Sequence, residues 1–590
     1  MPQPPIRIAN CSGFYGDRLS AAKEMVTGGP IDVLTGDWLA ELTMLILAKN
    51  RLRDPKAGYA RTFVTQMEQV MGECLERGIR VVSNAGGLEP AACAQAVGTV
   101  AQRLGLAPRI AYVEGDDILD RLDELKGAGI EFANLETGEA LGSRRVMTAN
   151  VYLGGWGITE ALAAGADIVI TGRVTDASLT MGPAAWHHGW STDAWNQLAG
   201  ALVAGHVLEC GTQATGGNYS FFREIDRLEH PGFPIAEIAA DGSAVITKHP
   251  DHGGMVSIGT VTAQLLYEIS GHRYLNPDVV AHFDSIDLEQ VAPNRVRISG
   301  TIGSPPPTTA KVAINCDSGY RSTNTVYLTG LDIAPKAQVF EDTLRTQLDQ
   351  DDFDSIEFRL EERTHDDPQT NVAAMSELRI VAKAGTTRVL DSLSRIITEL
   401  ALATYPGVFM SVGSNTPHAY GIYWPALIPS ELVHQEVVVG DTRHGVREFR
   451  GTRMGADHRA PAPNQDPAPC PTPTNRTLRQ QRVPLGRAFG ARSGDKGGNA
   501  NLGIWARSDA GYAWLSTKMT IECLRELLPE VQPLAIERYE FANLRAVNFV
   551  IVGLLGEGVA SSSRLDAQAK SLGEWLRARY VDLPEELLND

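Results

Sequence analysis

The sequence predicts an α/β protein with a parallel-sheet main domain, an α+β middle region and a small C-terminal ferredoxin-like α+β domain. In residues 1–204, short apolar strands alternate with glycine loops and helices, which is typical of parallel α/β units. Residues 205–460 lose this alternation and mix strands with a long helix. The prolines of residues 461–475 predict an extended linker before a final domain at 476–590.

The first domain is expected to gather polar loops at one edge of its sheet. Parallel strands end at the same edge, and open α/β sheets bind their ligands there. An amphipathic helix that ends at a glycine is predicted over Thr62–Arg77. The strands predicted in this domain are Ile6–Ala9, Ile31–Leu34, Ile79–Val82, Ile110–Val113, Val151–Leu153 and Asp167–Ile170.

Charged side chains follow the last of these strands. It delivers Thr171, Arg173 and Asp176 to its carboxyl end, where Arg173 could bind a carboxylate or phosphate and Asp176 could orient that group or act as a base. The alternative is an internal Arg–Asp ion pair that closes the sheet. Asp37 and Asn84 follow two other strands at the same edge and are lesser candidates for the same site.

A glycine loop between a predicted strand and helix is a candidate anion site. Gly154, Gly155 and Gly157 would let the backbone approach an anion at the N-terminus of the helix. The loop is not a full dinucleotide motif, because Glu160 stands where the third glycine belongs. The alternative is a tight turn without a ligand.

The segment after residue 204 contains a carboxylate, a thiol and a glycine pair. Glu209 is a candidate general acid or base, and Gly216 with Gly217 suits a loop that donates N–H groups to an oxyanion. Cys210 is a candidate nucleophile, although a small buried cysteine is the commoner case.

Later elements are predicted with less regular spacing. Strand patterns and helical patterns alternate after the linker in an order that resembles a small ferredoxin-like sandwich. The strands predicted are Arg295–Ser299, Lys311–Asn315, Val483–Ala488, Ala500–Ala506 and Leu544–Leu555, and the helices are Val389–Ala403, Met519–Leu528 and Asp566–Tyr580.

The densest run of glycine and polar residues lies in the C-terminal domain. Lys496 and the nearby amides predict a phosphate cradle, although Gly497 stands where a Walker A motif has Ser or Thr. The alternative is a hairpin tip. A domain this small offers too little surface for a whole substrate site, so we expect the loop to face a cleft shared with the main domain. The candidate residues are Ser493, Gly494, Asp495, Lys496, Gly497 and Asn499.

Composition and charge narrow the class of protein. Of the 590 residues, 43% are hydrophobic and 21% are charged, so the chain can bury large cores. The net charge of −18 argues against a nucleic-acid binder. Residues 476–590 differ from the rest because they carry 15 basic and 14 acidic side chains.

The sequence also favours a cytoplasmic protein without bound metal. No apolar run reaches the roughly 18 residues that span a bilayer. Met1–Pro5 lacks the features of a secretory signal, and the seven scattered cysteines favour reduced thiols. His249, Asp251 and His252 could ligate a metal, but their spacing matches no standard zinc pattern. We therefore predict no metal and no cofactor.

Three segments resemble the acyclic terpene utilisation family (AtuA-type proteins): Gly165–Asp176, Gly205–Gly211 with the following glycine pair, and Ser493–Asn499. The resemblance covers most of the chain, and the part after the linker resembles the family's ferredoxin-like domain. It implies a role in the bacterial breakdown of citronellol- and geraniol-type compounds through branched acyl-CoA thioesters. It implies no set of catalytic residues.

Three functions are compatible with these observations. The first is a cytoplasmic lyase or hydratase that acts on a branched acyl-CoA, with Glu209 or Asp176 as base and Arg173 binding a substrate carboxylate. The second is a nucleotide- or phosphate-handling enzyme, and the third is a non-catalytic subunit of an acyl-CoA enzyme complex. We expect a small-molecule partner and a homo-oligomer in which the C-terminal domain docks on its own or a neighbouring chain.

Overall fold

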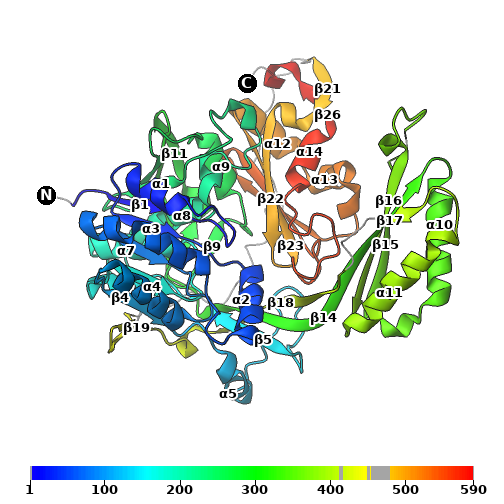
Figure 1. Cartoon of the computed structure of the whole chain (residues 1–590). Coiled ribbons are helices and arrows are strands. Elements are labelled where there is room, and N and C mark those ends of the chain that lie inside the picture. The colour runs from blue at the N-terminus through cyan, green and yellow to red at the C-terminus, as the bar shows by residue number, and fades with distance from the viewer. Residues whose placement is uncertain (1–2, 364, 411–415, 448–451, 453–478, 589–590) are drawn as a thin grey trace.

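The computed structural model describes residues 3–363, 365–410, 416–447, 452 and 479–588. The linker predicted at 461–475 lies outside the described residues. Figure 1 shows a main body, a lobe that projects from it, and a C-terminal domain packed beside the main body. We call the described residues of 320–410 the outer lobe. Within the described residues, no helix is long and apolar enough to cross a membrane.

An eleven-stranded mixed sheet forms the centre of the main body. The five central strands run parallel, and antiparallel strands extend the sheet on both sides. Residues from both sides of position 204 therefore contribute to one sheet. In spatial order the strands are β11 (Asp287–Ala292), β12 (Arg295–Ser299), β8 (Ala244–Lys248), β7 (Pro234–Ile238), β1 (Ile6–Asn10), β2 (Val33–Gly36), β3 (Arg80–Ser83), β6 (Ile168–Thr171), β4 (Ile110–Glu114), β19 (Glu436–Val439) and β20 (Thr442–Gly445).

Helices cover both faces of this sheet. Successive strand residues point to opposite faces, so Ile8 and Ala9 of β1 belong to two different hydrophobic cores, one on each face of the sheet. The predicted helix at Thr62–Arg77 is present as α3, and Gly78 ends it with a left-handed φ of 71°. The helices of the main body are α1 (Ala21–Thr27), α2 (Glu41–Arg53), α3 (Arg61–Arg77), α4 (Pro90–Leu104), α5 (Leu122–Gly127), α6 (Trp156–Ala163), α7 (Ser178–His188), α8 (Trp195–Leu208) and α9 (Ile258–Leu265).

One predicted parallel strand belongs to a different sheet. The segment expected at Val151–Leu153 is the end of β5 (Val146–Val151), which pairs antiparallel with the long strand β14 (Thr309–Thr329). Only a single parallel bridge, between Leu153 and Val174, ties this segment to the loop after β6. Its glycine loop therefore does not follow a strand of the main sheet.

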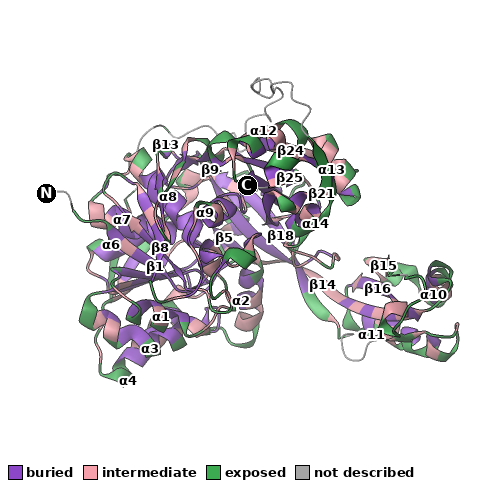
Figure 2. Cartoon of the chain, turned by 90° about the horizontal axis from the view of Figure 1, so that it is seen from above, coloured by how far each residue is buried: buried purple, intermediate pink, exposed green. Residues whose placement is uncertain are grey.

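The outer lobe has a ferredoxin-like arrangement that the sequence analysis did not predict. Its strand order is β15–β16–β14–β17, all neighbours are antiparallel, and one helix follows the first and the third strand in chain order. In Figure 2 the long strand β14 carries this lobe away from the main body. Its other elements are α10 (Ile333–Gln347), β15 (Ser355–Glu361), β16 (Met375–Ala384), α11 (Thr387–Glu399) and β17 (Phe409–Met410).

The C-terminal domain contains a four-stranded antiparallel sheet in the order β22–β23–β25–β24. Most of the segment predicted as a phosphate cradle, Ser493–Asn499, is strand, because β22 and β23 pair up to Lys496 and Asn499. Only a two-residue glycine tip separates them. The elements of the domain are β21 (Gln480–Pro484), β22 (Phe489–Lys496), β23 (Asn499–Ala506), α12 (Asp509–Lys518), α13 (Ile521–Leu527), β24 (Ile536–Phe541), β25 (Ala546–Ile551), α14 (Leu572–Ala578) and β26 (Tyr580–Pro584).

The C-terminal domain shares a hydrophobic core with the main body. Trp505, Tyr539 and Phe541 belong to the same buried cluster as the main-sheet residues. Ser220 adds a polar contact, since its hydroxyl donates to the carbonyl of Ala491 and accepts from the amide of that residue. The part of β22 near its start is thereby held against the main body.

Candidate active site

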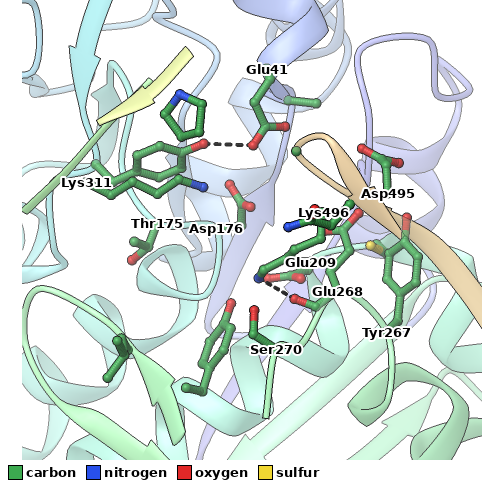
Figure 3. A pocket seen from close by; sticks show the side chains of 18 of the residues that line it. Glu41, Thr175, Asp176, Glu209, Tyr267, Glu268, Ser270, Lys311, Asp495 and Lys496 are labelled. Carbon is green, nitrogen blue, oxygen red and sulfur yellow. Dashed lines mark hydrogen bonds between the residues drawn. The ribbon is translucent and has the colours of Figure 1, made fainter. Parts of the chain in front are cut away.

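A cavity of about 1180 Å³ lies where the main body meets the C-terminal domain. This volume is somewhat larger than the roughly 300–1,000 Å³ of most small-molecule sites. Figure 3 shows acidic side chains and lysines that point into the same space from different elements. The candidates from the sequence that line it are Asp37, Arg173, Asp176, Glu209, Cys210, Gly217, Asp495, Lys496, Gly497 and Asn499.

Asp37 lines the cavity at the end of β2, and a hydrogen bond from Asn84 positions its carboxylate. The amide Nδ2 of Asn84 donates to Oδ1 of Asp37 (2.6 Å), and Oδ1 of Asn84 accepts from the backbone of Trp38 (2.8 Å). Burial raises the pKa of Asp37 to about 6, although Arg173 and Asn84 oppose this rise. Asp37 is therefore partly protonated near neutral pH.

Arg173 and Asp176 form an ion pair at the edge of the cavity. Nη2 of Arg173 lies 3.1 Å from Oδ1 of Asp176, and its Nη1 donates to the carbonyl of Leu39 (2.7 Å). The guanidinium also packs 4.3 Å from the ring centre of Tyr152. The internal pair that was the alternative interpretation is present, and both residues nevertheless line the cavity.

Asp116, which the sequence analysis missed, fixes the loop that carries Arg173. Its Oδ2 accepts from the backbone N–H of Arg173 (2.9 Å) and from Nδ2 of Asn150 (2.8 Å). Gly172 is needed here, because a Cβ at this position would lie 2.4 Å from the carboxylate. Thr171 plays a local part, since its hydroxyl donates to the carbonyl of Gly172.

Glu209 stands at the C-terminal end of α8 and is buried against the cavity wall. Burial, together with the nearby charges of Asp176 and Glu268, raises its pKa well above the ordinary value. His206 lies 3.1 Å away, but burial lowers the pKa of that imidazole to about 4, so it is neutral and does not pair with the carboxylate charge. Among the described residues, Oε2 of Glu209 has no hydrogen-bond partner.

Asp176, like Glu209, has a raised pKa. Burial is the main reason that its pKa is well above the ordinary value, and the acidic neighbours Asp37, Glu41 and Glu268 add to the effect against the opposing charge of Arg173. Figure 3 places Asp176 between Lys311 on one side and Glu209 with Lys496 on the other. Two acidic side chains with raised pKa values therefore face one cavity.

Two other predicted roles after α8 do not fit the geometry. Burial, and then the charge of Glu209, raise the pKa of the Cys210 thiol well above 9.0, so this residue is not an activated nucleophile. The amides of Gly216 and Gly217 donate to the carbonyls of Gln213 and Thr212 and are not available to an oxyanion. Gly216 instead serves the turn, with a left-handed φ of 108°.

The hairpin of the C-terminal domain enters the cavity through its tip. Nζ of Lys496 donates to the carbonyl of Glu268 (2.5 Å), and the amide of Gly498 donates to both carboxylate oxygens of Glu136 at 3.0 Å. A side chain on Gly497 would lie 2.2 Å from that same carboxylate. A carboxylate of the main body thus occupies the amides that the sequence suggested for a phosphate.

The first residues of this hairpin are structural. The hydroxyl of Ser493 is buried, donates to the carbonyl of Ala569 (2.7 Å) and accepts from the amide of Gly573 (2.9 Å). Gly494 allows the strand to pass the ring of Tyr267, which would lie 2.2 Å from an added Cβ. Neither residue lines the cavity.

The loop at Gly154 also holds a carboxylate of the protein. Asp278 accepts from the amide of Gly155 (2.7 Å), and an added Cβ on Gly154 would lie 2.1 Å from its carboxylate. Gly157 packs against Val113. The anion site predicted here is therefore filled internally, and none of the three glycines lines the cavity.

Several cavity residues had no sequence signal of their own. Glu41 at the start of α2 accepts from the hydroxyl of Tyr152 (2.9 Å). Glu268 adopts a left-handed φ of 57°, a strained conformation that is typical of functional sites. Lys311 lay inside a predicted strand, where nothing distinguished it from a surface lysine.

No metal centre is evident in the described part of the chain, where no three His, Cys, Asp or Glu side chains come together as ligands. Nε2 of His249 instead contacts the carbonyl of Met25 at 2.9 Å, and its ring stacks edge-on with that of His252.

Comparison with known proteins identifies the family. The model of the acyclic terpene utilisation family protein AtuA matches residues 6–439, and that of the AtuA ferredoxin-like domain matches residues 483–582. No curated protein and no solved structure matches the chain. The two matches cover the main body, the outer lobe and the C-terminal domain in chain order, and the chain therefore belongs to the acyclic terpene utilisation (AtuA) family.

Proposed function

We propose that this protein is an enzyme that transfers protons beside the carbonyl of a branched acyl-CoA thioester, as a lyase or a hydratase. The observation that carries the proposal is the pair Asp176 and Glu209, which face one cavity with raised pKa values. Paired carboxyl groups whose ionisation is mutually opposed can divide into an acid and a base. Membership of the acyclic terpene utilisation family supports a substrate from that breakdown, and the acyl-CoA thioester is part of the proposal.

The two groups have distinct surroundings, which suggests distinct roles. Asp176 is held by Arg173 and is the better candidate for the ionised base. Glu209 is more deeply buried, since its side chain is 4% exposed and that of Asp176 is 26% exposed, so it is the better candidate for the protonated acid. The positive charges of Arg173 and Lys496 face the same space and would stabilise an enolate oxygen.

The test is proton exchange on branched acyl-CoA thioesters in deuterated water, with isovaleryl-CoA and 3-methylcrotonyl-CoA as probes. We expect deuterium at the carbon beside the thioester carbonyl, and hydration of the unsaturated probe if the enzyme is a hydratase. The Glu209→Gln and Asp176→Asn variants should each lower the rate by about 10²–10⁴-fold, the usual contribution of an acid or base.

The matched control is Glu289→Gln, which removes a carboxylate of the same type from an exposed ion pair on β11. This variant should exchange at the wild-type rate. Wild-type rates in correctly folded Glu209→Gln and Asp176→Asn proteins would refute the assignment of the pair.

A further inference from the structure

Lys311 is a cavity residue that the proposed acid–base chemistry does not use. It lies on β14, where its carbonyl accepts from the backbone N–H of Tyr152 (2.9 Å) and its strand pairs with β18 (His418–Pro429). In this stretch β14 is paired with β18 on one side and with β5 on the other, so the backbone at Lys311 is held in place. Figure 3 shows its amino group directed into the cavity, toward Asp176.

Two aromatic rings flank the amino group. Nζ lies 4.9 Å from the ring centre of Tyr152 and 5.6 Å from that of Tyr423. Within the described chain, no carboxylate lies within ion-pair distance (4.0 Å) of Nζ. The amino group therefore packs against two tyrosine rings and is not engaged in a salt bridge with a described residue. It faces the space in which a substrate would lie.

The surroundings of Lys311 lower the pKa of its amino group. Burial is the first reason that its pKa is below the ordinary value of 10.5, and the cations Lys496 and Arg173 lower it further. Glu41 and Glu136 act in the opposite direction but do not reverse the shift. A desolvated lysine beside other cations is a known way to obtain a nucleophilic amine.

We propose that Lys311 forms an imine with the oxo group of a ketone or aldehyde bound in this cavity. Nζ adds to the carbonyl carbon, and the resulting hydroxyl group leaves as water after it takes a proton from a carboxyl group. A protonated carboxyl group that lines the same cavity supplies that proton. The balance is one amine and one carbonyl giving one imine and one water, and no oxidant or reductant is needed.

The imine would extend the chemistry of the cavity. A protonated imine withdraws electrons from the neighbouring carbon–carbon bond, so it suits the cleavage of substrates that carry an oxo group. The inference goes beyond the proposed function, because it depends on a different nucleophile and a different carbonyl from the thioester. It stands or falls independently of proton exchange by Asp176 and Glu209.

Reductive trapping tests the imine. The full chain is incubated near neutral pH with acetoacetate or 3-methylbutanal and sodium cyanoborohydride, whose hydride converts an imine into a stable secondary amine. Peptide mapping by mass spectrometry then locates the adducts. We expect the main adduct on Lys311, formed about tenfold faster than on an exposed lysine such as Lys56 for each unit by which its pKa is lower.

Matched variants separate the site from general labelling. Lys311→Met should abolish the fast adduct, whereas Lys56→Met should leave it unchanged, with circular dichroism verifying that both proteins are folded. Adducts distributed over lysines according to exposure, or an unmodified Lys311 with both probes in the wild-type protein, would overturn the proposal. Fast labelling of Lys311 that persists in the Glu209→Gln variant would support the imine proposal. It would also show that the imine does not depend on the result of the exchange experiment.

Discussion

At the scale of residues, the cavity is a concentration of charges that water does not fully screen. Asp37, Asp176, Glu209 and Asp495 each have a pKa above the ordinary value, and in each case burial is the first cause. Folding holds these carboxyl groups together because hydrophobic contacts elsewhere outweigh their desolvation. Such clustering of perturbed groups in a cavity is typical of functional sites.

Asn84 supports a prediction at this scale. Asn84→Ala would remove the donor to Asp37 and leave the buried N–H of Trp38 without its acceptor. We expect a loss of about 1–3 kcal/mol in the free energy of unfolding, the range for an unsatisfied buried polar group. The pKa of Asp37 should rise above about 6, because Asn84 lowers it in the wild-type protein. Urea unfolding and the pH profile of proton exchange measure the two effects, and an unchanged profile would contradict the positioning role.

A second prediction at this scale concerns Cys210. Because its thiol is protonated over the physiological range, Cys210→Ala should keep the exchange rate within about twofold of wild type. Exchange kinetics with isovaleryl-CoA measure this, and iodoacetamide should modify the wild-type residue slowly. A large loss of rate in a folded variant would restore the nucleophile hypothesis.

At the scale of elements, carboxylates of the protein occupy both glycine loops that the sequence suggested for anions. Asp278 fills the loop before α6, and Glu136 fills the tip between β22 and β23. The backbone amides of both loops do bind carboxylates, as in an anion site, but these carboxylates are side chains of the same chain. These loops join distant segments, which is a structural use of the same chemistry.

Gly154→Ala tests this use. An added Cβ would lie 2.1 Å from the carboxylate of Asp278, so the loop or the carboxylate must move, and we expect a loss of about 1–3 kcal/mol in unfolding free energy. Gly127→Ala is the matched control, because nothing lies within 4 Å of the Cβ that it adds in α5. Thermal unfolding of both variants measures the difference. Equal stability would show that the loop tolerates a side chain and does not depend on close contact.

At the scale of the whole molecule, the active-site candidate belongs to no single domain. Asp176 and Glu209 come from the main body, whereas Asp495 and Lys496 come from the C-terminal domain. Trp505 and Phe541 of the latter complete the core of the former. The two parts are therefore expected to fold and act as one unit.

Because of Asp495, the stability of the folded protein is expected to depend on pH. Burial, and then the charge of Glu268, raise its pKa to about 7, so the folded protein binds more protons than the unfolded chain between about pH 4 and pH 7. The stability from this group is complete below about pH 4 and is lost as the pH rises through 7. Calorimetry should show that Asp495→Asn raises the melting temperature at pH 8 and changes it little at pH 4. A larger gain at low pH would contradict this account.

Separating the domains is the last prediction. A chain of residues 1–475 would expose the apolar surface that Trp505, Tyr539 and Phe541 cover, so we expect it to aggregate when expressed alone. Coexpression with residues 476–590 as a second chain should restore a soluble complex, which size-exclusion chromatography would detect. A soluble, monomeric 1–475 fragment would show that the shared core is dispensable.

The sequence by itself determined the family, the parallel strands of the main sheet, helices such as α3 and the presence of a C-terminal ferredoxin-like domain. These features depend on apolar periodicity, glycine stops and short motifs, all of which are local. Asp176 and Glu209 were predicted as site candidates for the same reason, since each follows a recognisable local pattern.

Only the tertiary structure decided which candidates share the cavity and which are structural. Lys311 and Glu268 lacked a local signal, the strand before Gly154 left the main sheet to pair with β14, and the ferredoxin-like outer lobe came from pairings between strands far apart in the chain. The anion loops were filled by Asp278 and Glu136, which lie 123 and 362 residues from the amides that they bind. Burial and charge at a site are sums over such long-range neighbours, and a local pattern of residues does not contain them.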